Sequence, residues 1–527
     1  MLKKKRMQAI LARYGKRPKN RYDDEDLRCI RSYFDHRRAM EPQRFYLDET
    51  TWYDLSMDTV FDRVSNTGSA SGEQLLYYQI RCPATDRAEY DRRSGLIRLM
   101  EQDPALRGKL QLCISGLGKN NAARTIEAFA PAAHGPYRLI LALLLFAGLL
   151  LSGLSLFFTR LALPLFVLLL CGNPLYHISM IKRLDSSLPA ANYSVRLAAA
   201  FQQIRRLSHG ELAACMQSYD EAGRRTRRLA RMGGVSFMAD NDIMQLFNSL
   251  FLFDLILYEI LKIQLSRLRG EVFAVHECIG RIDAAIAVAS YRKSVAVTCD
   301  PDICFEPDAA PFLTATELVH PLLRRPVANT VELDASLLLT GSNASGKSTL
   351  AKAIALNAVL AQGICTALSA SYAATAFHIY TSMALTDDLL AGESYFVTEL
   401  KAFKRILEAA QRGERVLCVI DEVLRGTNTV ERIAASSTLL EYLAGRPLLC
   451  IAATHDIELC TLLDGHFTMA HFEEAIVDGQ IVFDYRLRPG AACTRNAIRL
   501  LSQMGFASAL TAAAENRAEG YLEKGHW

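Results

Sequence analysis

The chain of 527 residues is half hydrophobic and carries 60 basic and 56 acidic side chains, which leave a net charge of +4. This composition excludes an intrinsically disordered chain, and the length predicts two to four domains with apolar cores of their own. Because the charges nearly balance, the net charge does not indicate which partners the protein binds. The thirteen cysteines lack metal-like Cys/His spacing and are typical of reduced cytosolic thiols.

The N-terminal segment is strongly basic. Its first 21 residues hold nine Lys or Arg and no acidic residue, and they lack the pattern of a signal peptide. Positive clusters of this kind neutralise phosphates of nucleic acids, bind anionic lipid headgroups or form solvated surfaces. The sequence leaves these three readings open for Lys3, Lys4, Lys5, Arg6, Arg13, Lys16, Arg17, Lys19 and Arg21.

Two apolar runs follow in the middle of the chain. The first, 139–158, has twenty residues without a charge, which as a helix is long enough to cross about 30 Å of hydrocarbon. The second, 161–181, is weakened by two prolines, an asparagine and a histidine. Arg138 precedes the pair and Lys182 and Arg183 follow it. By the positive-inside rule, this predicts a two-span membrane hairpin with both flanks, and hence both termini and the remaining chain, in the cytoplasm.

A second reading of these runs is a helical hairpin buried in a large soluble core. The run Leu250 to Ile263 is also very apolar, but Asp254 and Glu259 interrupt it, so it is predicted to be a core helix. Between these apolar stretches lies a second basic cluster, for which nucleic acid, lipid or solvent again remain open. Its members are Arg224, Arg225, Arg227, Arg228 and Arg231.

A phosphate-binding loop is predicted after residue 340. Gly341 is followed by four residues and then by Gly346-Lys347-Ser348, between a strand-like run at 336–339 and a helix-forming run at 350–360. Glycines let successive backbone N–H groups face phosphate oxygens, the lysine reaches the β- and γ-phosphates, and the serine ligates magnesium. The residues expected to hold a nucleotide here are Gly341, Asn343, Ser345, Gly346, Lys347, Ser348 and Thr349.

Two further strands end in groups suited to hydrolysis. The apolar strand that begins at Arg415 ends in Asp421, expected to hold magnesium, and Glu422, expected to orient or deprotonate the attacking water. A strand at 448–454 ends at His455, placed to contact the γ-phosphate or the water, and Asp456 is expected to orient its imidazole.

These three motifs resemble the ATPase domain of MutS-type proteins of DNA mismatch repair, since Gly426-Thr427-Asn428 continues the acidic motif as in that family. The resemblance implies an α/β P-loop NTPase domain of the ABC-like MutS type that uses ATP and Mg2+. It also implies a homodimer with composite sites, in which a serine of one subunit completes the partner's site. Ser394 is the matching residue, although Tyr395 replaces the usual threonine, and Asn329 is expected to help seat the nucleotide.

The resemblance also covers flanking helices, because 47–55, 69–83 and 281–289 resemble parts of the all-α MutS core. The resemblance implies a helical core at 45–136 and 184–300 and an ATPase domain at 301–490. Where the family has lever helices and a DNA clamp, this chain has the hairpin region 137–183. The remaining parts are the basic segment 1–44 and C-terminal helices at 491–527, namely 494–504 and 508–524.

The expected function is a membrane-anchored MutS-like ATPase that couples hydrolysis at composite dimer sites to DNA binding. Mismatch recognition itself is not expected, because the residues before the core leave no room for a mismatch-reading domain, and likeness of fold alone does not establish function. The alternative is an ATP-driven remodeller or scaffold at the membrane that acts on a protein or lipid partner without DNA. A regulator that binds nucleotide without hydrolysis is disfavoured by Glu422.

Overall fold

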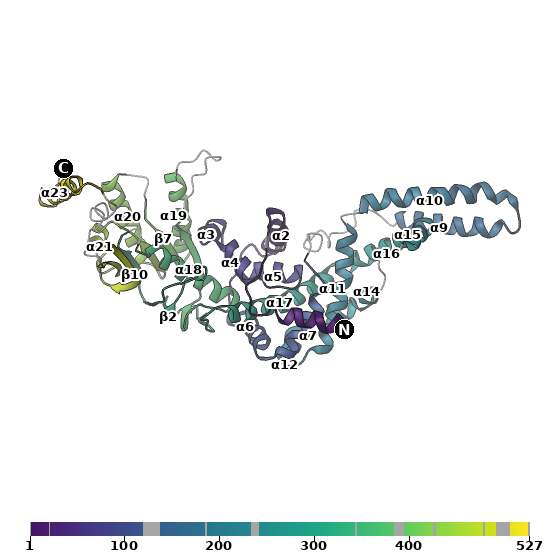
Figure 1. The fold of residues 1–527 in the computed structure, drawn as a ribbon, viewed down its shortest axis with the longest axis horizontal. Coiled ribbons are helices and arrows are strands. Elements are labelled where there is room, and N and C mark those ends of the chain that lie inside the picture. Colours follow the sequence, from purple (N-terminus) through teal and green to yellow (C-terminus); the bar gives the residue numbers. More distant parts are fainter. Residues whose placement is uncertain are drawn as a thin grey trace. The chain divides into compact units, whose positions relative to one another are not determined.

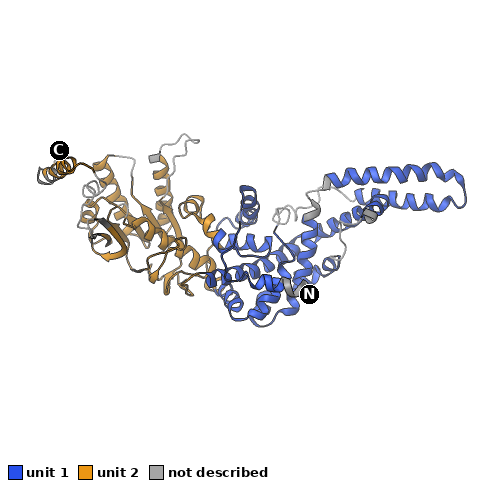
Figure 2. Cartoon of the chain, in the orientation of Figure 1, with its two compact units in different colours: residues 1–44, 62–79, 91–294 blue, residues 45–61, 80–90, 295–527 orange. Residues whose placement is uncertain are grey.

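The computed structural model describes residues 2–20, 22–119, 137–184, 187–232, 242–342, 345–383, 395–424, 428–477, 480–491 and 506–524. Two compact units divide the chain (Figures 1 and 2). Unit 1 is helical and comprises residues 1–44, 62–79 and 91–294, and unit 2 comprises residues 45–61, 80–90 and 295–527. The extent of the helical core predicted from sequence stays a prediction.

Unit 2 is built on a six-stranded sheet with strand order β10-β9-β4-β8-β7-β6. Every neighbouring pair is parallel except the terminal hairpin of β9 and β10. A second sheet has four strands in the order β1-β5-β2-β3. The strands are β1 Asp302–Cys304, β2 Leu313–Leu318, β3 Asn329–Leu333, β4 Leu337–Thr340, β5 Ser371–Thr375, β6 His378–Ser382, β7 Val416–Asp421, β8 Leu449–Ala453, β9 Thr468–Val477 and β10 Gln480–Pro489.

The central strands are continuous apolar runs because helices cover both faces of the sheet. On one face Cys418 and Ile420 of β7 pack in a buried cluster with Phe403 of α19 and Leu440 of α20. Helix α18 contacts β6, β7 and β8 and buries fifteen of its residues. The helices of unit 2 are α3 Glu49–Asp54, α18 Lys347–Ile364, α19 Tyr395–Gln411, α20 Thr429–Ala444, α21 Glu458–Leu462 and α23 Ser508–Lys524.

The edge strand β6 is held by the early segment 45–61. The carboxylate of Asp54, 1% exposed, accepts hydrogen bonds from the Thr381 hydroxyl at 2.7 Å and from the Met383 N–H at 3.0 Å. A buried carboxylate is tolerated only when such donors satisfy it. This early segment therefore belongs to the structural support of the sheet.

Unit 1 packs its helices around α17, which buries seventeen residues. Glycines allow the closest approaches, since a Cβ at Gly280 would lie 2.7 Å from Leu75 Cγ, and one at Gly72 would lie 2.1 Å from Asp283 Oδ2. The helices wholly in unit 1 are α1 Leu2–Leu11, α2 Asp24–Met40, α7 Pro104–Ile114, α9 Tyr137–Ser155, α10 Leu163–Leu184, α11 Ser187–Leu207, α12 Gly210–Gln217, α13 Asp220–Arg225, α14 Arg227–Arg231, α15 Asp242–Phe251, α16 Phe253–Arg267 and α17 Arg269–Ser294. Helices α4 Met57–Val64, α5 Ala70–Arg81 and α6 Arg87–Gln102 have residues in both units.

One part of unit 1, the apolar arm, consists of α9, α10, α15 and α16, which run side by side (Figure 1). Helices α9 and α10 form the predicted hairpin. The first helix ends at Ser155, three residues before the predicted end, and Phe157 and Phe158 lie in the connection, 86% and 85% exposed. Pro174 lies inside α10, where its missing N–H removes one helical hydrogen bond.

Candidate functional site

The glycine-rich loop joins β4 to α18, as the sequence predicts. Gly341 and Gly346 have φ angles of +130° and +108°, which side chains other than glycine rarely adopt. A Cβ at Gly341 would also lie 2.9 Å from the carbonyl oxygen of Phe472 on β9. Both glycines are therefore required by the path of the backbone.

Lys347 is folded back over this loop. Its Nζ donates to the carbonyl oxygens of Gly341 at 2.5 Å and Ser342 at 2.9 Å, and the residue is 3% exposed. Burial lowers the pKa of Lys347, against the opposing effect of the Glu422 and Asp421 carboxylates. Because those charges act on the lysine, the two predicted motifs lie close together in the fold.

The Ser345 hydroxyl is buried, and within the described residues it has no hydrogen-bond partner. An unsatisfied buried hydroxyl costs free energy unless a ligand supplies the missing bond. A phosphate bound in this loop would supply an oxygen that accepts a hydrogen bond from the Ser345 hydroxyl. Ser348 and Thr349 follow in the first turn of α18, half-buried and exposed respectively.

The predicted carboxylates and histidine come together at the ends of β7 and β8. The parallel register pairs Asp421 with Ala453, and the Glu422 N–H donates to the carbonyl of Ala453 at 2.9 Å. His455 Nδ1 lies 3.3 Å from Glu422 Oε1. Glu422 has a φ of +58°, a strained conformation that costs about 1 to 3 kcal/mol and is concentrated at functional sites.

The contact with Glu422 raises the pKa of His455 above its ordinary value of 6.5, chiefly through the hydrogen bond. A raised folded-state pKa means that the stabilisation by this pair is fully present below pH 6.5 and is lost as the pH rises through the raised value. We expect a 1H–15N NMR titration of the His455 ring to have its midpoint above 6.5. Glu422→Gln should lower that midpoint, and a wild-type midpoint at or below 6.5 would mean that the pair does not form.

Asp456 does not have the role predicted from sequence. Its carboxylate accepts two hydrogen bonds from the Arg432 guanidinium, at 3.0 and 2.7 Å, whereas the imidazole of His455 is paired with Glu422. Arg432 lies in the first turns of α20, which begins after Asn428, whose side chain caps the helix by accepting from the Glu431 N–H at 3.0 Å. Asp456 therefore fixes α20 beside the site.

A pocket of about 280 Å³ adjoins the phosphate loop. Its walls are mostly apolar and aromatic, the usual lining for the nucleoside part of a nucleotide, with Arg325 as a charged member. Burial lowers the pKa of His320 to about 4, which keeps this imidazole uncharged near neutral pH. The lining residues are Leu318, His320, Leu323, Arg325, Pro326, Val327, Asn329, Gly346, Thr349, Leu350, Ala353, Phe472 and Tyr485.

Asn329 lines this pocket, but its amide is engaged elsewhere. Nδ2 donates to the Tyr485 carbonyl at 3.0 Å and Oδ1 accepts from the Leu487 N–H at 2.7 Å, so the side chain ties β3 to β10. Sequence reasoning missed Phe472 and Tyr485, because they come from the hairpin of β9 and β10, more than a hundred residues after the loop. Of the other predicted residues, Asn343, Ser394, Gly426 and Thr427 lie outside the described residues.

The side chains present suit a magnesium ion carried in with a nucleotide. Within the described residues there is no cluster of three or more His, Cys, Asp or Glu that would hold a metal by itself. Magnesium usually keeps several waters and binds one or two carboxylates together with substrate phosphates. Asp421 and Ser348 provide such a partial set.

The apolar arm meets the length and composition needed to cross a membrane. Tyr137–Ser155 and Arg160–Lys182 are long and apolar enough, and only 17% and 11% of their most apolar stretches are buried. Helices in a soluble core are mostly buried, so the predicted alternative of a buried hairpin fits these exposures poorly. Leu144, Leu151 and Leu175 are 64%, 65% and 70% exposed.

Asn173 and His177 of α10 contact residues on either side of a break between two neighbouring helices. Helices α15 and α16 are interrupted at Leu252, which has a φ of +57°. Asn173 Nδ2 donates to the carbonyl of Leu250 at 2.9 Å, and His177 Nε2 lies 2.8 Å from Asp254 Oδ2. In an apolar surrounding, backbone groups freed by a break must find internal partners. Through these bonds Asn173 and His177 have polar partners on the neighbouring helices.

The run predicted to be a core helix therefore has two parts. Beyond the break, Leu255, Tyr258 and Leu261 of α16 are buried, as expected of a core helix. Before it, α15 packs on α10 and leaves Leu246 and Phe247 62% and 46% exposed. Asn173 lies about 16 Å from the end of α10 at 1.5 Å per residue, so the break stands near the middle of that helix.

The fold and these contacts define the class of the protein, an α/β sheet domain with a glycine-rich loop between strand and helix. Residues 337–521 match MutS domain V. The chain is thus MutS-related, and it contains this domain.

Individual relatives support the same assignment. The chain is 28% identical to MutS protein homolog 4 of Homo sapiens over 258 residues, 46% of this chain and 27% of that protein. It is 34% identical to the DNA mismatch repair protein MutS of Thermus thermophilus over 218 residues, 39% of this chain and 26% of that protein. DNA mismatch repair protein MutS 2 of Haloarcula marismortui is 33% identical over 172 residues, 32% of this chain and 18% of that protein. The chain spans about a quarter or less of these relatives.

Proposed function

We propose that the protein is a membrane-anchored ATPase that hydrolyses ATP at composite sites of a homodimer. The observation that carries this proposal is the convergence of Lys347, buried over the glycine-rich loop, with Asp421 and the strained Glu422, whose carboxylate contacts His455. The match to MutS domain V supports it independently. The apolar arm supports attachment to a membrane, with the sheet domain and both termini on the cytoplasmic side.

Each residue has a distinct task in this reaction. The triphosphate would displace the loop carbonyls from Lys347, whose ammonium then neutralises the β- and γ-phosphates. Magnesium held by Ser348 and Asp421 would supply charge neutralisation at the phosphates. Glu422 orients the water and accepts its proton, and His455, bonded to Glu422, stabilises the charge of that carboxylate and donates toward the γ-phosphate.

The nucleoside part of ATP fits the pocket beside the loop. Tyr485, which is 45% exposed, offers an aromatic face on which a base stacks, whereas Phe472 lines the pocket with an exposure of only 3%. The Cβ of a side chain at Gly346 would lie 3.2 Å from the Tyr485 ring. The glycine thus lets the ring and the phosphate loop stand close together. A base on Tyr485 and phosphates on Lys347 would then be the two ends of one ligand.

A mixing experiment tests both the activity and the composite site. The full chain with Lys347→Ala should be inactive, because the phosphates lose their buried cation, and Ser394→Ala should be inactive because the partner's site is incomplete. In an equal mixture of the two variants, heterodimers contain one intact site, so about a quarter of the wild-type ATPase rate should return with random pairing. The measurement is phosphate release by detergent-solubilised protein.

The controls separate the parts of the proposal. Lys404→Ala, on an exposed face of α19 with a side chain 76% exposed, should leave the rate unchanged. An active Lys347→Ala variant would refute the assignment of hydrolysis to this phosphate loop. If each variant is inactive alone and the mixture shows no ATPase activity either, the composite site is refuted, while the role of Lys347 stands.

DNA is the ligand that we propose for the ATP-driven change, on the strength of the names of the two relatives called DNA mismatch repair protein. A second candidate is a protein or lipid partner in the membrane, which the apolar arm favours. Binding of the solubilised protein to duplex, mismatched and branched DNA over a range of salt concentrations distinguishes them. Phosphate contacts weaken steeply with salt, whereas undetectable binding at low salt would leave the second candidate.

A further inference from the structure

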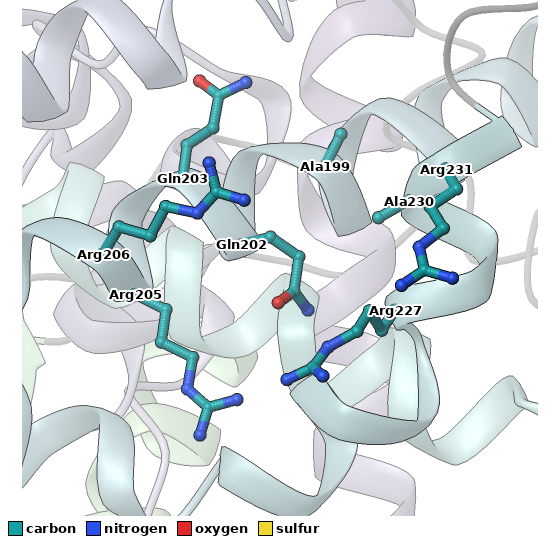
Figure 3. Close-up of a pocket in the computed structure, with 8 residues that line it drawn as sticks. All are labelled: Ala199, Gln202, Gln203, Arg205, Arg206, Arg227, Ala230 and Arg231. Atoms are coloured by element: carbon teal, nitrogen blue, oxygen red, sulfur yellow. The ribbon is translucent and has the colours of Figure 1, made fainter.

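A basic pocket lies in unit 1, and none of its lining residues belongs to the proposed nucleotide site. It has a volume of about 600 Å³ and is formed by one face of α11 and one face of α14 (Figure 3). The spacing i, i+3, i+4 and i+7 of Ala199, Gln202, Gln203 and Arg206 places these residues on one face of α11, with Arg205 at its side. The members on α14 have the spacing i, i+3 and i+4. The lining residues are Ala199, Gln202, Gln203, Arg205, Arg206, Arg227, Ala230 and Arg231.

The pocket holds four guanidinium groups and few opposing charges. Arg205 pairs with Asp220 at 3.0 Å. Within the described part of the chain, Arg206, Arg227 and Arg231 have no carboxylate partner within 4 Å. Like charges gathered around one concavity repel one another, so an anion in the pocket would relieve an unfavourable arrangement.

The small residues of the lining leave the space that the arginines surround. Ala199 and Ala230 occupy facing positions of α11 and α14, and Gln202, anchored by its Nε2 to the Gly223 carbonyl at 2.6 Å, lies between the arginines of the two helices in Figure 3. Guanidinium groups bind phosphate oxygens in pairs with fixed geometry. Four of them with an anchored amide match an anion that carries more than one negative oxygen.

In the structure, only some arginines of the basic cluster predicted from sequence, residues 224–231, line this pocket. Arg227 and Arg231 line the pocket, whereas Arg225 is paired with Glu221 and Glu271 at 2.7 and 2.8 Å. Arg224 and Arg228 are exposed and do not line it. The cluster therefore offers its own control residues, equal in charge and near in sequence.

We infer that this pocket is a binding site for a phosphate-bearing anion, either the headgroup of an anionic lipid or a free phosphorylated solute. Its place in the chain connects it to the apolar arm, because α11 begins at Ser187, directly after α10 ends at Leu184. Helix α11 also packs against α16 of the arm. An anion bound between α11 and α14 would fix the helix through which the arm joins the rest of unit 1.

The test uses the full chain in a zwitterionic detergent with Lys347→Ala, so that the nucleotide site does not contribute. Titration calorimetry measures the binding of pyrophosphate in one arm and of a short-chain phosphatidylglycerol in the other, with phosphatidylcholine as the neutral lipid. Arg206→Gln with Arg231→Gln should weaken binding at least about tenfold. Arg224→Gln with Arg228→Gln, which removes the same charge outside the pocket, should change it by less than about twofold.

Each outcome decides a point. Binding of pyrophosphate alone identifies a free phosphorylated solute, and binding of the anionic lipid identifies a headgroup. Equal losses in both double variants, or no binding of either probe, would overturn the site. Binding of duplex DNA through Arg206 and Arg231 without binding of either small probe would also overturn it and mark a nucleic-acid surface. Melting curves of the two double variants that match the wild type show that the fold is kept. The ATPase rate, measured on chains that retain Lys347, tests the proposed function separately.

Discussion

Glu422→Gln should leave ATP binding within about threefold of the wild type while turnover falls by at least about 100-fold, the usual contribution of a positioned general base. The substitution keeps size and shape but removes the carboxylate that contacts His455 at 3.3 Å. Binding depends instead on the phosphate loop, Lys347 and the aromatic pocket, none of which changes. Equilibrium binding of a fluorescent ATP analogue and single-turnover hydrolysis measure the two quantities separately.

The matched control is Glu408→Gln on α19, where the carboxylate is 52% exposed and lies 3.9 Å from the ammonium of Lys404. It removes the same charge from the same unit and should leave both quantities unchanged. Hydrolysis by Glu422→Gln at the wild-type rate would show that another group activates the water. A parallel loss of binding would instead mean that the substitution disturbs the strained turn at φ +58°.

Local sequence predicted the parts of the nucleotide site that local geometry requires. The loop from Gly341 to Lys347 needs glycines because its backbone has positive φ angles at both. The strand before Asp421 is predictable because a buried parallel strand is a continuous apolar run. Strand ends on one edge of a parallel sheet bring Glu422 and His455 together, with Nδ1 of the histidine 3.3 Å from Oε1 of the glutamate.

Partners chosen by tertiary packing were not predictable in this way. Asp456 follows His455 directly, yet its carboxylate binds Arg432 because α20 passes beside it. Asn329 was expected to contact the nucleotide, yet its amide oxygen accepts a hydrogen bond from the N–H of Leu487 on β10. Both side chains have more than one suitable partner in the folded chain, and sequence spacing carries no information on which of them lies nearer.

The apolar arm shows the same division. Hairpin length follows from composition alone, whereas the break at Leu252 follows from packing. On either side of it, Leu250 and Asp254 each bond to a residue of α10 that is 77 positions earlier. Asn173 and His177 looked like weaknesses of a membrane span when considered one by one. In the structure they satisfy a carbonyl and a carboxylate that an apolar surrounding would leave unpaired. Polar residues with such partners are compatible with a span.

Leu144→Arg together with Leu175→Arg should release the protein from the membrane. Both leucines are exposed on the arm, 64% and 70%, near the middles of α9 and α10. A central arginine costs about 2.5 to 3.5 kcal/mol of insertion free energy, so two should cost about 5 to 7 kcal/mol. The measurement is the fraction of protein that stays in the membrane pellet after an alkaline carbonate wash.

If the arm is part of a soluble protein, the two arginines should not change the distribution of the protein between membrane and supernatant. Arginine at an exposed position of a soluble helix is tolerated, usually within about 0.5 kcal/mol, and would raise solubility. The control pair is Leu462→Arg with Leu510→Arg, which are 52% and 63% exposed on α21 and α23 of unit 2 and should leave the distribution unchanged. Wild-type protein recovered in the wash, with the arm variant distributed identically, would refute the anchor. Because the described residues of the proposed nucleotide site all belong to unit 2, ATP hydrolysis by the released variant would show that the anchor is not needed to build that site.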